Sequence, residues 1–526
     1  MRLSSVLRMA AVLPVAGLLL AACGGGGGGG SVGGGPTVTL SGKASFDLVP
    51  SNGAQGALNY NAISAKPVRG AVVDVIGADG DTLLASTSTD EQGAYSVQVP
   101  ANRAIRVRVR AQSIASGPGA KWEVSVRDNT QGNAIYAMES PPFGSEAADT
   151  TRDVHAPSGW GGRRYTGQRV AGPFAILDTV QQAMAKVRTV APEASFPPLR
   201  LFWSPDNVPA GGSVALGQIG TTSYTNDSAG AAIFVLGKED VDTDEYDDSV
   251  IAHEWGHYYQ HAFSRDDSPG GPHGFNDRLD QRLAFSEGWG NAWSGMALGK
   301  SHYTDSLGPG QGPGTDLDLS AGGPSPAGWY REASIQSVLW RLHSLHGFAP
   351  IHQAMSGSLR TTPALTTVHS FAAAYATALP SSRSELSALL AGQAISGVTD
   401  DPWGSQENND GGLWNLVLPL YKGLTVGAQF NDACVSNRFG LDNKLGSFVY
   451  LRYTIQTAGR YNVSVSGQGN VDPDFDVYAG ARLASATGLG ASESLAVSLP
   501  AGDVVVALQD ANNSSDRTCF QINVHP

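Results

Sequence analysis

Charge is scarce in this sequence, and so are long apolar runs. Asp, Glu, Lys and Arg make up 15% of the 526 residues, against about 25% in an average globular protein. The formal net charge is −13 and no basic cluster is available to neutralise phosphates, so we expect no nucleic-acid partner. Many serine hydrolases carry their nucleophile in a G-x-S-x-G turn between a strand and a helix, and the sequence predicts no such turn.

What the sequence does contain predicts several β-rich folded units. Hydrophobic residues account for 41% of the chain, which is enough for several cores and excludes overall disorder. Glycine (66 residues) and proline (29 residues) are abundant, as is typical of β modules joined by turns and long loops. At roughly 150 residues per domain, the length suggests about three domains.

The N-terminus has the plan of a signal peptide over residues 1–22. Two arginines precede an apolar run over residues 9–20, which is too short for a membrane-spanning helix. The run ends in Leu-Ala-Ala-Cys at Cys23, which resembles the lipobox of bacterial lipoproteins. The resemblance implies a lipidated Cys23 and an extracytoplasmic protein anchored to a membrane, with the outer membrane or cell surface favoured. An ordinary secretory peptide with an incidental cysteine is the alternative.

Two cysteines remain once Cys23 is set aside. Cys434 and Cys519 lie in the last hundred residues. In an oxidising compartment, two cysteines most simply form one disulfide, and we predict that bond here. As zinc ligands they would need closer spacing and additional His or Cys residues.

The first half of the chain is predicted to begin with a β domain. A glycine-rich tether over residues 23–36 precedes alternating apolar and polar residues over 37–112, which predict a β-sandwich. The stretch from Lys66 to Val73, followed by the one from Thr89 to Tyr95, resembles the carboxypeptidase regulatory-like fold. Residues 113–170 are punctuated by Gly, Ser and Pro and are predicted to be a connecting segment.

The second half is predicted to hold one α+β domain and one β domain. Over residues 171–425, strands come first and helices follow, the latter near 246–263, 282–297 and 332–346. Residues 430–526 return to alternating strands and look like the C-terminal sandwiches of secreted bacterial peptidases. In that region Asp472, Asp474 and Asp476 could hold calcium, but aspartates in a Pro-containing turn are more often a solvated loop.

The central domain carries an H-E-x-x-H motif at His253, Glu254 and His257. On a helix, the two histidines lie about one turn apart on nearly the same face, so both imidazoles can hold one metal ion. Glu254 then lies beside that ion. The motif predicts one zinc ion, with Glu254 as the general base that takes a proton from the attacking water.

A second motif supplies a third ligand through a resemblance. The sequence E-G-W begins at Glu287, thirty residues after His257, and together with H-E-x-x-H it resembles the gluzincins, the thermolysin-like and fungalysin-like zinc peptidases. The resemblance implies Glu287 as the third ligand. It also implies that Asn291, where the family usually has Asp, orients a ligand imidazole. Asp277 and Asp280, in the intervening loop, are rival ligands.

The reaction also needs a hydrogen-bond donor for the developing oxyanion. Tyr330, His343 and His346 flank a predicted helix at the place where related peptidases carry such a donor, and Tyr330 is the first choice among them.

The sequence therefore predicts a multidomain protein: an α+β zincin-type metallopeptidase domain flanked by two β-sandwich domains. The expected function is zinc-dependent hydrolysis of peptide bonds in extracytoplasmic proteins or peptides. Two alternatives remain open, a catalytically silent binding or adhesin lipoprotein and a zinc amidase that acts on cell-wall peptides.

Overall fold

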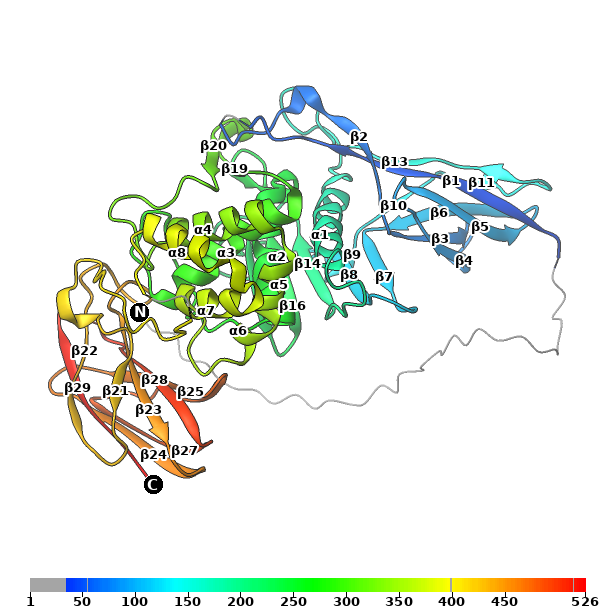
Figure 1. Ribbon diagram of the computed structural model, residues 1–526. Helices are drawn as coiled ribbons and strands as arrows, with labels where there is room; N and C mark the ends of the chain where they lie inside the picture. The colour runs from blue at the N-terminus through cyan, green and yellow to red at the C-terminus, as the bar shows by residue number, and fades with distance from the viewer. Residues whose placement is uncertain (1–34, 54, 398–399, 514) are drawn as a thin grey trace.

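The computed structural model describes residues 35–526, except 54, 398–399 and 514. The predicted signal peptide, Cys23 and most of the tether lie outside the described residues. Figure 1 shows a β-rich N-terminal region, a central region of helices and a C-terminal β region, arranged in that order along the molecule. The protein is therefore multidomain, as predicted. Among the described residues, no helix combines the length and apolar character needed to cross a membrane.

Two five-stranded sheets form the N-terminal region, and their strands alternate as the sequence predicts. In β6 (Ala104–Arg110), Ile105, Val107 and Val109 are fully buried while the intervening residues are not. The first sheet contains β1 (Thr37–Leu48), β2 (Ser64–Pro67), β5 (Ala94–Pro100), β12 (Thr150–Thr151) and β13 (Val154–Ala156). The second contains β6 together with β3 (Val72–Gly77), β4 (Leu83–Ser88), β10 (Ala137–Glu139) and β11 (Phe143–Gly144).

Residues 113–170 are not a simple connecting segment, so that prediction is wrong. β7 (Gln112–Ala115), β8 (Trp122–Asp128) and β9 (Ala134–Ile135) belong to the sheet of the central domain, and the chain then returns to complete both N-terminal sheets. Apart from β8, these strands have two to four residues and are too short to show an alternating pattern in the sequence. One continuous hydrophobic core consequently runs through the N-terminal and central regions.

The central sheet has the order β15-β16-β14-β8-β7. β14 (Leu199–Trp203) lies parallel to both β8 and β16 (Gly230–Val235), whereas β15 (Ser223–Asp227) is antiparallel to β16 and forms one edge. The first helix, α1 (Gly172–Arg188), packs its buried face, including Ile176, Val180 and Met184, towards this sheet and α2. β14 and β16 come before the motif helices, as predicted, but α1 precedes both strands.

The helices after the sheet bring the two sequence motifs together. α2 (Asp248–Phe263) contains H-E-x-x-H, and α3 (Gln281–Leu298) contains Glu287. α3 lies between α2 and α4 (Glu332–His346) and makes its most extensive contacts with them. Around them lie α5 (Ala349–Ser356), α6 (Ser358–Thr361), α7 (Val368–Ala378), α8 (Arg383–Gly392) and the hairpin of β19 (His302–Ser306) and β20 (Gly314–Asp318).

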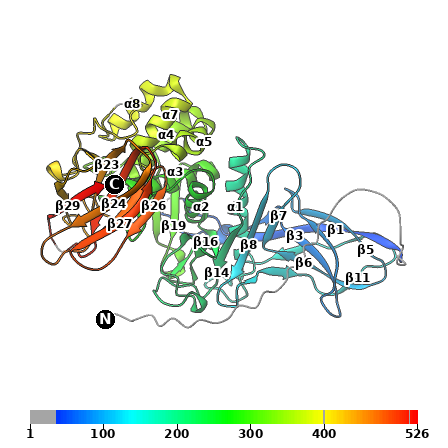
Figure 2. The same cartoon turned by 90° about the horizontal axis from the view of Figure 1, so that it is seen from below.

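The C-terminal region is a two-sheet β structure with its own hydrophobic core. Seen from below, it lies against the helical region at the end away from the N-terminal sheets (Figure 2). One sheet has β21 (Lys422–Leu424), β23 (Phe448–Ile455), β28 (Gly502–Asp510), β25 (Pro473–Tyr478) and β26 (Arg482–Ala486). The other has β22 (Phe430–Val435), β29 (Thr518–His525), β24 (Gly459–Ser466) and β27 (Ser492–Leu499). The predicted disulfide between Cys434 and Cys519 is confirmed, and it joins directly opposed residues of β22 and β29.

Candidate metal centre

The two motif helices approach each other closely because glycines face the contact. A Cβ on Gly290 of α3 would lie 2.7–2.9 Å from ring atoms of His253, and one on Gly256 of α2 would lie 3.2 Å from the Cα of Gly290. Behind this contact, the buried Trp289 indole donates to the carbonyl oxygen of Gly256 at 2.9 Å. The spacing of the helices is thus fixed by packing that does not depend on a metal ion.

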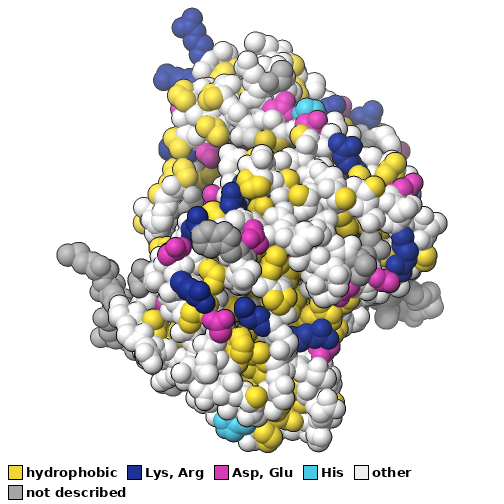
Figure 3. Space-filling model, turned by 60° about the vertical axis from the view of Figure 1, so that its left-hand side comes forward, with side chains coloured by type: hydrophobic (Ala, Val, Ile, Leu, Met, Phe, Trp, Pro, Cys, Tyr) yellow, Lys and Arg dark blue, Asp and Glu magenta, His cyan; other side chains and the backbone are white. Residues whose placement is uncertain are grey.

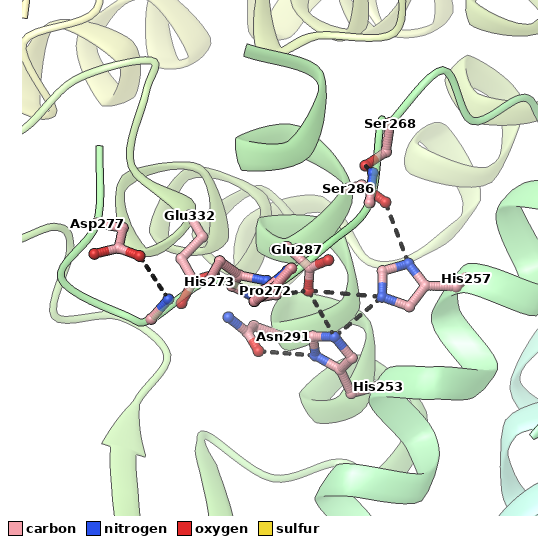
Figure 4. Close-up of polar contacts among 12 residues, drawn as sticks. His253, His257, Ser268, Pro272, His273, Asp277, Ser286, Glu287, Asn291 and Glu332 are labelled. Carbon is pink, nitrogen blue, oxygen red and sulfur yellow. Dashed lines mark hydrogen bonds and ion pairs between the residues drawn. The ribbon is translucent and has the colours of Figure 1, made fainter. Parts of the chain in front are cut away.

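Three side chains converge where α2 and α3 cross (Figure 4). The Nε2 atom of His253 lies 3.1 Å from Oε2 of Glu287 and 3.1 Å from Nε2 of His257. The Nε2 atom of His257 lies 3.7 Å from the same Glu287 oxygen. One ligand atom from each residue falls within 4.8 Å of the others, so the set could hold one metal ion.

Hydrogen bonds at Nδ1 of the two histidines leave the Nε2 atom of each ring as an acceptor. Nδ1 of His253 lies 2.9 Å from the Asn291 side-chain oxygen, and Nδ1 of His257 lies 3.3 Å from that of Gln260. Because an amide oxygen accepts, each neutral ring carries its proton on Nδ1 and turns a lone pair on Nε2 towards Glu287. Two lone pairs and a carboxylate that meet at one point need a cation between them. This donor set therefore fits a zinc ion.

The electrostatics of the metal-free residues point the same way. Burial opposes the charged form of His257, but the neighbouring Glu287 carboxylate raises the pKa of His257 to about 10. Glu287 is itself buried, yet the histidines hold its pKa well below the usual value. In the metal-free protein a proton thus supplies the positive charge that the cluster requires.

Glu254 lies beside the cluster, in a cleft of about 990 Å³ that the two histidines and Glu287 also line. Its Oε2 accepts a hydrogen bond from the backbone N–H of Tyr224, on the edge strand β15, at 2.7 Å. Burial raises the pKa of Glu254 above its ordinary value. Glu254 is therefore fixed in direction and more basic than a solvated carboxylate.

Sequence reasoning missed a fourth residue at this centre, His273. Its Nε2 lies 3.3 Å from Oε2 of Glu287 and 3.5 Å from Oε2 of Glu332, the first residue of α4. Burial opposes its charged form, but these contacts raise the pKa of His273 to about 9. The only sequence signal was a histidine between Pro272 and Gly274 in the loop that joins the two motif helices, and the path of that loop was not predictable.

The other candidate residues lie elsewhere. The oxyanion role assigned to Tyr330 is corrected, because its hydroxyl donates to the Ala327 carbonyl at 3.0 Å, and Tyr330 is not among the residues that line the cleft. His343 contacts Lys186 and His346 pairs with Glu385. The short stretch around residue 330 had suggested a donor only through its place in the chain.

The rival ligands are used in other ways. Asp277 accepts from the backbone of Gly274 at 2.9 Å and pairs with Lys444 at 3.3 Å. Asp280 caps the start of α3 and pairs with Arg282.

The candidate calcium residues of the C-terminal region do not converge. Asp472 accepts from the Gly490 backbone, and Asp476 accepts from the Ser485 hydroxyl. In the described part of the chain, the carboxylate oxygens of Asp472, Asp474 and Asp476 do not all lie within 4.8 Å of one another.

Comparisons with known proteins add little. No model of a known protein family matches the chain, and no curated protein sequence matches it. The pre-peptidase C-terminal domain of collagenase from Bacillus anthracis aligns over 20% of this chain and 93% of its own, at 11% identity and a TM-score of 0.16. PliG, a periplasmic inhibitor of g-type lysozyme from Aeromonas hydrophila, aligns over 20% of this chain and 96% of its own, at 16% identity and a TM-score of 0.14. TM-scores this low carry no argument, so the case for a function rests on the geometry of the site.

Proposed function

We propose that the protein is an extracytoplasmic, lipid-anchored zinc peptidase whose metal is held by His253, His257 and Glu287. The observation that carries the proposal is the convergence of these three acceptor groups, from two helices, beside a fixed carboxylate in an open cleft. A zinc ion held there supplies Lewis-acid chemistry, in that it polarises a carbonyl group and makes water more acidic.

The residues of the chain divide the remaining work. Glu254 takes a proton from the attacking water and later returns it to the leaving amine, as its raised pKa suits. Asn291 keeps the His253 ring in its orientation and tautomer. His273 lines the cleft, with its Nε2 3.3 Å from Oε2 of Glu287, and is the donor we assign to the developing oxyanion in place of Tyr330.

The edge strand suits an extended peptide. Ser223 and Tyr224 of β15 line the cleft, and β15 is the last strand on its side of the sheet. An extended substrate can pair with such an edge through main-chain hydrogen bonds, which hold it without regard to its side chains. This arrangement favours a peptide over a small amide.

The proposal is tested by comparing the wild type with Glu254→Gln on a mixed peptide library while zinc content is measured. We expect the wild type to bind one zinc ion and to cleave peptides. The variant should retain zinc but lose at least 10²–10⁴-fold in rate, the usual value of a general base. Unchanged turnover in the variant would refute the role of Glu254, and a zinc-free, inactive wild type would refute the proposed function.

A further inference from the structure

A second group of acidic side chains lines the same cleft as the metal centre. Asp242, Asp244 and Asp305 each direct a carboxylate oxygen to one place, where these oxygens lie within 4.8 Å of one another. Asp242 and Asp244 lie just before α2, whereas Asp305 comes from β19, which follows α3. Segments about sixty residues apart therefore bring three carboxyl groups together.

The surrounding protein does not fully satisfy the hydrogen-bonding capacity of this group. Asp244 is 3% exposed, yet its Oδ1 has no hydrogen-bond partner among the described residues, and neither has Oδ1 of Asp242. The basic residues nearest in sequence, Lys238 and Lys300, pair with other carboxylates. A buried acceptor without a partner is costly, so this group has places for hydrogen-bond donors that the described residues do not supply.

Two walls connect the acidic group to the metal centre. On one wall, Tyr224 donates its backbone N–H to Glu254, and two residues earlier the Thr222 hydroxyl donates to Asp244. On the other, the Tyr303 ring lies 6.0 Å from the ring of the ligand His253.

The second wall also places the acidic group one step along β19 from the residue beside the metal centre. Asp305 lies two residues after Tyr303 on β19, hence on the same face of the strand. Alternate residues of a strand are about 7 Å apart, which is also the spacing of alternate residues in an extended peptide. The acidic group therefore lies within reach of a substrate residue close to the scissile bond.

We propose that Asp242, Asp244 and Asp305 form a subsite that binds a cationic nitrogen of the substrate, either a basic side chain or the free amino terminus. This inference rests on the proposed peptidase function and names its substrate class. An ammonium group donates three hydrogen bonds, which matches three carboxylates that meet at one point. A calcium ion, by contrast, takes six to eight oxygen ligands.

The ionisation of the group agrees with this assignment. Burial, together with the neighbouring Asp242, raises the pKa of Asp305 to about 7, and burial likewise raises the pKa values of Asp242 and Asp244. A bound cation would relieve this repulsion and keep the carboxylates ionised.

The test uses matched peptides and works for any cleavage sequence. Peptides are paired so that lysine replaces norleucine, or a free amino terminus replaces an acetylated one, at each position near the bond that the wild type cleaves. In at least one pair we expect the cationic peptide to be preferred by about 10- to 100-fold in kcat/KM, which is the value of a hydrogen bond to a charged group. Asp305→Asn should reduce that preference to a few-fold. Asp316→Asn, on the neighbouring strand and paired with His302, should leave it unchanged.

Binding to the zinc-loaded Glu254→Gln protein, measured by calorimetry, separates this inference from the proposed function. The subsite is supported if the cationic peptides bind more tightly and Asp305→Asn abolishes this preference. That result would hold even if the wild type cleaves none of the peptides. Equal affinity for both members of every pair overturns it. Calcium ion alone is titrated in parallel. The inference is also overturned if calcium binds tightly, Asp305→Asn abolishes that binding, and no preference for cationic peptides is seen.

Discussion

As neutral rings, His253 and His257 present the same tautomer to the candidate metal centre, because each has an amide oxygen behind it. Asn291 serves His253, and Gln260 serves His257. The gluzincin resemblance implies a carboxylate where Asn291 stands. An uncharged oxygen accepts the same N–H but makes the imidazole a weaker base. The tautomer is therefore preserved, and we expect the proposed zinc ion to be bound less tightly than beside a carboxylate.

His273 gives the sharpest test of a single side chain. It touches Glu287 and Glu332 but comes from a loop, so its removal should leave the helices and the zinc ion in place. We expect His273→Ala to keep zinc and to lose about 10²–10³-fold in kcat, as when one oxyanion donor is removed. His261→Ala is the control, because that exposed histidine of α2 hydrogen-bonds the Asn226 side chain and does not line the cleft. A loss of zinc from His273→Ala would instead make His273 a ligand.

The crossing of α2 and α3 depends on glycine at particular positions. Glycines lie at positions 288, 290 and 295 of α3. Only Gly290 among them faces His253 of α2, whereas Gly288 faces Ile335 of α4. Gly295 faces Leu319 and Trp340, and Trp340 also belongs to α4. The glycines thus let both α2 and α4 approach α3 closely.

Gly290→Ala should therefore damage the site although alanine favours helices. The added Cβ would fall within 2.9 Å of the His253 ring, and overpacking of this kind costs about 1–3 kcal/mol. Zinc affinity should fall as well, since the ring must move. Gly392→Ala, at the end of α8 with nothing within 4 Å, should instead leave stability unchanged or raise it by up to about 1 kcal/mol. Equal unfolding midpoints and equal zinc titrations for both variants would contradict this view of the crossing.

The residues of the site differ in how far the sequence could predict them. Helical spacing and residue type were sufficient for His253, Glu254 and His257, because local geometry alone puts them on one face. Glu287 required a resemblance, since its distance from His257 is set by tertiary packing. His273 and the three clustered aspartates come from loops and short strands, whose paths leave no periodic signal. Tyr330 was misassigned for that reason.

The C-terminal region also contacts the start of the ligand-bearing helix. Arg282 of α3 is 1% exposed and pairs with Asp280 at 2.9 Å. Its guanidinium lies 4.4 Å from the ring centre of Phe448 and 5.2 Å from that of Tyr450, both in β23. The C-terminal sheets thus brace the helix that carries Glu287. On the face shown in Figure 3, basic and acidic side chains are interspersed among neutral surface.

The Cys434–Cys519 disulfide should stabilise this region, because it closes a sequence separation of 85 residues. A loop of that length restricts the unfolded chain by about 4–5 kcal/mol in the entropy model. The double variant Cys434→Ala/Cys519→Ala should therefore unfold at a clearly lower denaturant concentration than the oxidised wild type. If the two midpoints coincide, the bond contributes nothing to stability.

The central claim is that Glu287 is the third ligand of a zinc ion, and the metal content of Glu287→Ala tests it most directly. Glu287 is 8% exposed and contacts both ligand histidines, so its loss should remove most of the bound zinc. Asp277→Ala, measured alongside, should retain the metal because Asp277 pairs with Lys444 instead. Full zinc occupancy in Glu287→Ala, with loss in Asp277→Ala, would contradict the account.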